Sequence, residues 1–280
     1  MKEVLNAITV DVEDWFHICD IETILPPSQW DRCESRVEKN VMKILEILSK
    51  NRVFGTFFVL GYVARRLPEV IKMIAEEGHE IASHGFGHTQ IYKMTPDEFE
   101  KDLNRSKRVI QWATGGEVCG YRAPEWSIKK GRRNSLWALP ILAANGFRYD
   151  SSIAPLRIIG IPSASRKPYT IQTDHGKIEE FPPLVKNTWV GNVPIGGGWG
   201  LRVFPYGMIR RAIGELNSQG IPVVIFLHPS EFDPDPPRIP LPVSKRFVCH
   251  GKIRSTEERL ERLIADFPFG AIREIYGDSP

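Results

Sequence analysis

The stretch Glu80-Ile81-Ala82-Ser83-His84-Gly85-Phe86-Gly87-His88 places two histidines four residues apart at the end of a short apolar run. On a helix, this spacing would put both imidazoles on one face. Two glycines so close together would cost a helix about 2 kcal/mol, so we expect a strand that runs into a glycine loop. Glycine tolerates the backbone angles of a tight return, so such a loop can turn both rings toward one ion. Two histidines at this spacing also occur as ordinary core or surface residues.

Strand-like and helix-like segments alternate about seven times along the chain. This alternation predicts an α/β fold with parallel strands and helical crossovers. The expected strands are 7–12, 54–59, 79–83, 119–122, 147–150 and 221–227, with a short β-like piece at 177–181. The expected helices are 36–50, 68–77, 96–112, 134–145 (kinked or shortened by Pro140), 206–218 and 256–266. Between Ser152 and Gly200 the periodicity gives no layout, and Gly196-Gly197-Gly198-Trp199-Gly200 fits a plain turn better than a ligand loop.

Composition excludes several classes of protein. The 280 residues are 42% hydrophobic and 25% charged, with a formal net charge of +3, which fits a globular protein and gives no footprint for nucleic acid. The four cysteines are scattered, as is typical of free thiols in a reducing compartment. The sequence shows no signal-peptide core and no transmembrane segment, so we expect a cytoplasmic location. The oligomeric state stays open, with a homo-oligomer as one option.

Polar residues follow the ends of several expected strands. Catalytic groups collect at the carboxyl ends of the strands in barrels of this type, so the pattern predicts one shared site. The residues in these positions are Asp11, Asp14, His84, His88, Arg122, Asp150 and His228. Two neutral imidazoles and one carboxylate suffice to bind zinc or a similar divalent ion, and a site of this kind activates water for hydrolysis.

The chain resembles the polysaccharide deacetylases of carbohydrate esterase family 4, the NodB-homology domain, and most closely their exosortase- and exopolysaccharide-associated branch. The resemblance covers nearly the whole chain. It rests on the runs Thr9-Val10-Asp11-Val12-Glu13-Asp14-Trp15-Phe16-His17, Ser83-His84-Gly85-Phe86-Gly87-His88, Tyr121-Arg122-Ala123-Pro124, Tyr149-Asp150-Ser151-Ser152 and Phe226-Leu227-His228-Pro229.

The resemblance implies a distorted (β/α)7 barrel that removes acetyl groups from N-acetylated amino sugars. We expect a single domain over residues 1–280, with a core of about 1–232 and an extension at 233–280. The expected cofactor is a divalent metal, Zn²⁺ before Co²⁺ or Ni²⁺, and the expected partner is an acetylated amino-sugar polymer or oligosaccharide. An allantoinase-like hydrolase of a small cyclic amide, or an inactive sugar-binding relative, are the alternatives.

The resemblance also implies a role for each site residue. Asp11 matches the base, His228 the general acid, and Arg122 the arginine that pairs with the base. Asp14, His84 and His88 match the metal ligands. The backbone N–H of Glu125 is expected to stabilise the oxyanion, and Asp150 is expected to pair with His228 and raise its pKa.

The carboxylate ligand has two candidates. Much of the family has two adjacent aspartates, whereas Val12 and Glu13 separate Asp11 from Asp14. Alternation along a regular strand would put Asp11 and Glu13 on the same side, which favours Glu13. We nevertheless expect Asp14, because the strand should end and turn here. His17 is a further ligand candidate, although packing or a substrate contact suits it better.

Several aromatic side chains are candidates for stacking on sugar rings, and core packing is the alternative for each. Trp126 and Trp199 are the favoured pair because both follow motifs expected at the rim. The other two candidates are Trp15 and Phe16.

Overall fold

A nine-stranded sheet organises the computed structural model, which describes residues 3–189 and 191–277. Its strands run in the order β10-β1-β2-β3-β4-β5-β7-β6, and β11 adds a second partner to β1. The strands are β1 (Asn6–Val12), β2 (Thr56–Val59), β3 (Glu80–Ser83), β4 (Gly120–Tyr121), β5 (Tyr149–Asp150), β6 (Tyr169–Thr173), β7 (Gly176–Glu180), β10 (Val224–Leu227) and β11 (Phe269–Gly270). A separate two-stranded sheet pairs β8 (Val185–Thr188) with β9 (Gly191–Pro194).

The central strand is β1, whose seven residues are all buried. A strand buried on both faces is typical of a parallel sheet covered by helices. It pairs in parallel with β10 on one side and β2 on the other, with Asp11 opposite Phe58. The parallel pairing continues through β3, β4, β5 and β7, so the carboxyl ends of seven strands point to one rim.

The barrel has a seam between β7 and β10. The ladder of the main sheet does not continue around it, but two isolated parallel bridges, Pro183–Val224 and Gly197–Phe226, connect across this gap. A Cβ on Gly197 would lie 2.0 Å from the Phe226 carbonyl oxygen, so only glycine allows this approach. The expectation of a distorted seven-stranded barrel is confirmed, with a sheet that is not continuously closed.

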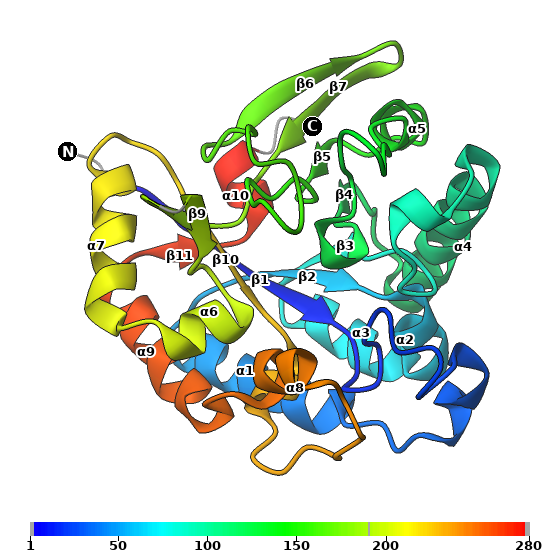
Figure 1. Cartoon of the computed structure of the whole chain (residues 1–280), viewed down its shortest axis with the longest axis horizontal. Helices are drawn as coiled ribbons and strands as arrows, with labels where there is room; N and C mark the ends of the chain where they lie inside the picture. The colour runs from blue at the N-terminus through cyan, green and yellow to red at the C-terminus, as the bar shows by residue number, and fades with distance from the viewer. Residues whose placement is uncertain (1–2, 190, 278–280) are drawn as a thin grey trace.

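Helices surround the strands, with α7 and α9 at one side of the view and α4 at the other (Figure 1). The helices are α1 (Val37–Lys50), α2 (Gly61–Arg66), α3 (Pro68–Glu76), α4 (Pro96–Thr114), α5 (Ala138–Ala144), α6 (Gly198–Val203), α7 (Tyr206–Asn217), α8 (Val243–His250), α9 (Thr256–Asp266) and α10 (Ile272–Tyr276). The capping box expected at α4 is present: Thr95 accepts from the Glu98 N–H while the Glu98 side chain accepts from the Thr95 N–H. None of the helices within the described ranges combines the length and the apolar character that crossing a bilayer requires.

Residues 269–273 are part of the sheet architecture. β11 pairs with β1, and the N–H of Ile272 donates to the Thr56 hydroxyl at 2.8 Å. The N–H of Arg273 donates to the Glu80 carboxylate at 3.0 Å. The tail therefore closes the end of the barrel opposite the rim, because Thr56 and Glu80 begin β2 and β3.

The structure departs from the sequence predictions in two places. The helix expected over 134–145 begins only at Ala138, so Pro140 lies in its first turn, where a missing N–H costs nothing. The stretch 196–200 is not a plain turn, because Gly197 bridges to β10 and Gly198 begins α6.

Candidate active site

The loop after β3 brings the two histidines together, as the glycines predicted. Gly85 and His88 both have left-handed φ angles, of 75° and 52°. The His84 and His88 rings lie 5.3 Å apart between centroids, and both residues lie beside the pocket at the rim. The Nδ1–H of His84 donates to the Arg122 carbonyl at 2.8 Å, which leaves its Nε2 lone pair facing the pocket.

Glu13, and not Asp14, faces these imidazoles. Its Oε2 lies 2.5 Å from Nε2 of His88 and 3.7 Å from Nε2 of His84. The carboxylate of Asp14 accepts instead from the Ser35 hydroxyl at 2.6 Å and from the Arg36 N–H at 3.1 Å. The expectation of Asp14 as ligand thus disagrees with the geometry. The Glu13 N–H donates to the Asp11 carbonyl at 2.9 Å, so the chain makes a tight turn at Val12, and this turn leaves Glu13 facing the two histidines.

The donor set of Glu13, His84 and His88 fits a divalent cation. One ligand atom from each residue lies within 4.8 Å of the other two. Oε2 of Glu13 is buried and accepts no hydrogen bond among the described residues, despite its closeness to two imidazoles. Burial would raise the pKa of Glu13, but the charge of His88 and the close approach of both imidazoles hold it well below its usual value. A carboxylate with two nitrogen donors is a zinc-type ligand set.

Arg122 fixes the Asp11 carboxylate beside this cluster. Its Nη1 lies 2.6 Å from Oδ1 of Asp11 and donates also to the Thr9 hydroxyl at 2.9 Å. Its other side donates to Ser151, through Nη2 to the hydroxyl at 2.8 Å and through Nε to the carbonyl at 3.3 Å. The guanidinium also lies 4.0 Å from the Phe58 ring centroid. With four hydrogen bonds and the ring contact, the arginine holds Asp11 in one orientation.

His228 faces the carboxylates from the other side of the pocket, after β10. Its Nε2 lies 3.8 Å from Oδ2 of Asp11 and 3.9 Å from Oε1 of Glu13. Its Nδ1 faces the Glu231 carboxylate at 3.6 Å. Burial would lower the pKa of His228, but the hydrogen bond and charge of Glu231 raise it to about 9. Glu231 itself is held by Arg202, at 3.2 Å.

Asp150 is not the partner of His228, which corrects the sequence expectation. Asp150 accepts from the Ser152 hydroxyl, and Ser152 in turn accepts from the Ala123 N–H at 2.8 Å. The residue therefore supports the backbone beside Arg122. It lies at the end of β5, whereas the partner of His228 comes from the turn directly after His228 itself.

The pocket walls include the other candidate residues. Glu125, Trp126 and Trp199 all line a cavity of about 430 Å³ with the ligand cluster, a volume in the range of small-molecule sites. Glu125 and Trp126 have left-handed φ angles of 51° and 46°, as strained residues at functional sites often do. The side chain of Glu125 accepts from Gln90 at 2.6 Å.

The remaining aromatic candidates divide between wall and core. Trp15 lines the pocket, whereas Phe16 is buried in the core. Nδ1 of His17 accepts from the Asp14 N–H at 2.8 Å, and burial holds its pKa well below the usual value, so its Nε2 carries the proton. A protonated Nε2 is a hydrogen-bond donor and not a metal ligand.

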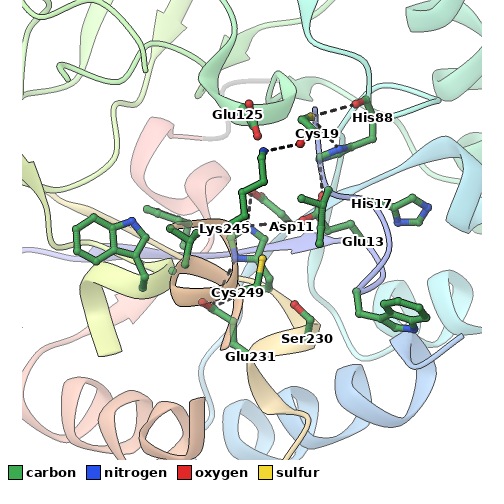
Figure 2. Close-up of a pocket in the computed structure, with 18 of the residues that line it drawn as sticks. Asp11, Glu13, His17, Cys19, His88, Glu125, Ser230, Glu231, Lys245 and Cys249 are labelled. Carbon is green, nitrogen blue, oxygen red and sulfur yellow. Dashed lines mark hydrogen bonds and ion pairs between the residues drawn. The ribbon is translucent and has the colours of Figure 1, made fainter. Parts of the chain in front are cut away.

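Sequence reasoning missed four residues that contribute to the site. Glu231 could have been found from its place three residues after His228, the spacing of a helix cap. Thr9 and Ser151 hold Arg122 and carry no pattern of their own. Lys245 extends from α8 across the pocket and donates to the Cys19 carbonyl at 2.6 Å, and nothing in the sequence brings these distant segments together (Figure 2).

Comparisons with known proteins find deacetylases among the relatives of this chain. Residues 29–143 match the family model described as polysaccharide deacetylase, and residues 151–277 match that of a domain of unknown function, DUF3473. The chain is 26% identical over 212 residues to a peptidoglycan deacetylase of Helicobacter pylori, covering 73% of this chain and 68% of that protein. It is 33% identical over 97 residues to a peptidoglycan-N-acetylmuramic acid deacetylase of Bacillus subtilis, covering 32% of this chain and 37% of that protein.

Residues 29–143 belong to the polysaccharide deacetylase family. The chain is thus placed among amide-hydrolysing enzymes. Among solved structures, a polysaccharide deacetylase-like protein of Mycobacterium smegmatis superimposes with a TM-score of 0.66 at 23% identity, over 98% of this chain and 90% of that one. That likeness supports the barrel fold. The deacetylase family model includes His84, His88 and Arg122, while Asp11 and Glu13 lie before it and His228 within the second matched region.

Proposed function

We propose that this deacetylase is metal-dependent and removes the N-acetyl group from N-acetylhexosamine units of a polysaccharide or its precursor, releasing acetate. The observation that carries the proposal is the convergence of three metal-type ligands with a fixed carboxylate on one side and an imidazole on the other. Glu13, His84 and His88 form the ligand set. Asp11 and His228 face each other across the same pocket.

A divalent ion held by Glu13, His84 and His88, zinc in our proposal, would polarise the amide carbonyl and make a water more acidic. Asp11 accepts the proton of the attacking water, and Arg122 keeps it aimed at that position. The water oxygen bonds to the carbonyl carbon. The backbone N–H of Glu125, at the pocket wall, is proposed to donate to the developing oxyanion.

His228 completes the reaction by giving a proton to the leaving nitrogen. The C–N bond then breaks, the sugar amine leaves, and acetate remains. Glu231 holds Nδ1 of His228, so that Nε2 points at the pocket. Trp126 and Trp199 offer apolar surfaces against which a sugar ring can pack.

The test is acetate release from chitooligosaccharides and from peptidoglycan fragments, before and after chelation. A chelator should abolish the release, and zinc or cobalt should restore it. Asp11→Asn should keep the metal and lose about 10²- to 10⁴-fold in turnover, the range of a general base. Acetate release that survives complete metal removal would contradict the proposal, as would cleavage of allantoin in place of acetylated sugars.

A further inference from the structure

Helix α8 has two different faces, and only one belongs to the catalytic pocket. Lys245, Val248 and Cys249 line the cavity. On the opposite side, Val243 is 73% exposed and Phe247 is 49% exposed, with Arg246 between them. The spacing of three and four residues puts Val243, Arg246 and Phe247 on one helical face. No residue of α8 is buried, and the outer face is largely uncovered within the described chain, although the Phe247 ring lies 6.2 Å from the Trp199 ring between centroids.

The segment that carries α8 is strongly basic. Residues 236–255 contain five basic side chains and no aspartate or glutamate. Four of the five are exposed and form no ion pair with the described residues: Arg238, Arg246, Lys252 and Arg254. A segment with this charge attracts an anionic surface.

Exposed apolar side chains also gather around the same cavity. Ile158 is 92% exposed and Trp189 is 97% exposed. Both belong to segments that reach the pocket. Ile159, the neighbour of Ile158, lines the pocket, and so does Pro194 of the β8–β9 hairpin, which carries Trp189 near its tip. With Val243, Phe247 and Val248, these make five of the eight large apolar side chains that the described residues expose. Such a concentration marks an interaction surface.

We propose that the outer face of α8, with the basic segment 236–255, docks on an anionic lipid bilayer and so places the mouth of the catalytic pocket at the membrane surface. Apolar side chains beside exposed cations on a helical face are what an interfacial contact with anionic headgroups requires. The aromatic Trp189 and Phe247 would suit a sugar as well as a bilayer, whereas the aliphatic Val243 and Ile158 favour the bilayer. The docking does not depend on the proposed deacetylation.

The experiment measures co-sedimentation of the full chain with vesicles of phosphatidylcholine, alone or mixed with phosphatidylglycerol. The wild type should bind the mixed vesicles more tightly than the neutral ones, and added NaCl should weaken the binding because salt screens exposed charges. The double variant Val243→Asp/Arg246→Glu should weaken binding at least about tenfold, because it removes an apolar contact and reverses a charge.

A matched control is Trp112→Asp/Arg132→Glu, which makes the same change in charge and also removes an exposed apolar side chain, 75% exposed on α4. It should bind like the wild type. Equal binding to neutral and anionic vesicles, or an equal loss in the control, would overturn the proposal. Binding to soluble alginate without binding to vesicles would overturn it in favour of an anionic polymer.

Acetate release from a soluble chitooligosaccharide tests the deacetylase function independently of membrane docking. Val243→Asp/Arg246→Glu should keep it, since neither residue lines the pocket. If the wild type released no acetate, the proposed function would fail while vesicle binding could still be measured.

Discussion

Glu13 and Asp14 are neighbours in the chain with opposite surroundings. The Glu13 carboxylate has a buried oxygen without a hydrogen-bond donor and two imidazole nitrogens nearby. The Asp14 carboxylate has three donors, from Trp15, Ser35 and Arg36, and joins the end of β1 to the start of α1. The surroundings of Glu13 suit a bound cation. The Asp14 carboxylate already has its hydrogen-bond donors from the protein.

This contrast predicts different losses from two conservative substitutions. Glu13→Gln should lower the bound metal well below one equivalent, because it removes the only carboxylate of the ligand set. Asp14→Asn should keep the metal and lower the free energy of unfolding by about 1–3 kcal/mol, since charge-assisted hydrogen bonds are weakened. Elemental analysis and urea unfolding give both quantities. If Asp14→Asn lost the metal and Glu13→Gln kept it, our assignment of the ligand would be reversed.

At the residue scale, the sequence predicted the members of the site better than their pairings. His84, His88, Asp11, Arg122 and His228 converge, because each follows a parallel strand and those strand ends share a rim. The partner of His228 could not be predicted from the order of the strands. Its Nδ1 faces Glu231, three residues later in the chain, and not a residue at the end of another strand. The choice between Glu13 and Asp14 depended on the residue at which β1 ends and the chain turns. The strand propensities of the residues do not determine that position.

At the scale of elements, β5 and β7 end in two buried carboxyl groups. Asp150 and Glu180 are both fully buried, and Oδ2 of Asp150 and Oε2 of Glu180 each have no partner among the described residues. Burial raises the pKa of Asp150 to about 6. Burial and the nearby Asp150 charge raise that of Glu180 well above its usual value. The pair is therefore expected to hold a proton where an isolated carboxyl group would have lost it.

The folded state then binds more protons than the unfolded state above a pH of about 4.5, so stability should fall as pH rises toward and past about 6. Glu180→Gln mimics the protonated carboxyl and should remove much of this dependence. We expect the variant to gain on the order of 1–3 kcal/mol over the wild type at pH 8, and less at pH 5, by urea unfolding. Glu179→Gln, next along β7, is the control and should keep the wild-type profile. Identical profiles for Glu180→Gln and the wild type would show that the pair holds no proton.

At the scale of the whole molecule, the alternation of strands and helices was predictable and the closure of the barrel was not. Short apolar runs identify the central parallel strands, such as β1, which is buried along its whole length. The seam depends on Gly197 approaching the Phe226 carbonyl and on Pro183 meeting Val224. These are contacts between segments far apart in sequence, and a run of glycines and prolines has no period from which to infer them.

A further prediction at the same scale concerns the C-terminal residues 267–277. Ile272 of α10 is fully buried with Ala7, Phe58, Ala82 and Val224, inside the end of the barrel opposite the catalytic rim. If residues 267–277 fold together with the core, Ile272→Ala should lower the free energy of unfolding by about 2–4 kcal/mol, because it leaves a cavity among the strands. Ile158→Ala, at a side chain 92% exposed, should change it by less than about 0.5 kcal/mol. Urea unfolding followed by tryptophan fluorescence measures both. A small loss at Ile272 would mean that the tail unfolds before the barrel, and the core expected at about 1–232 would then be the cooperative unit.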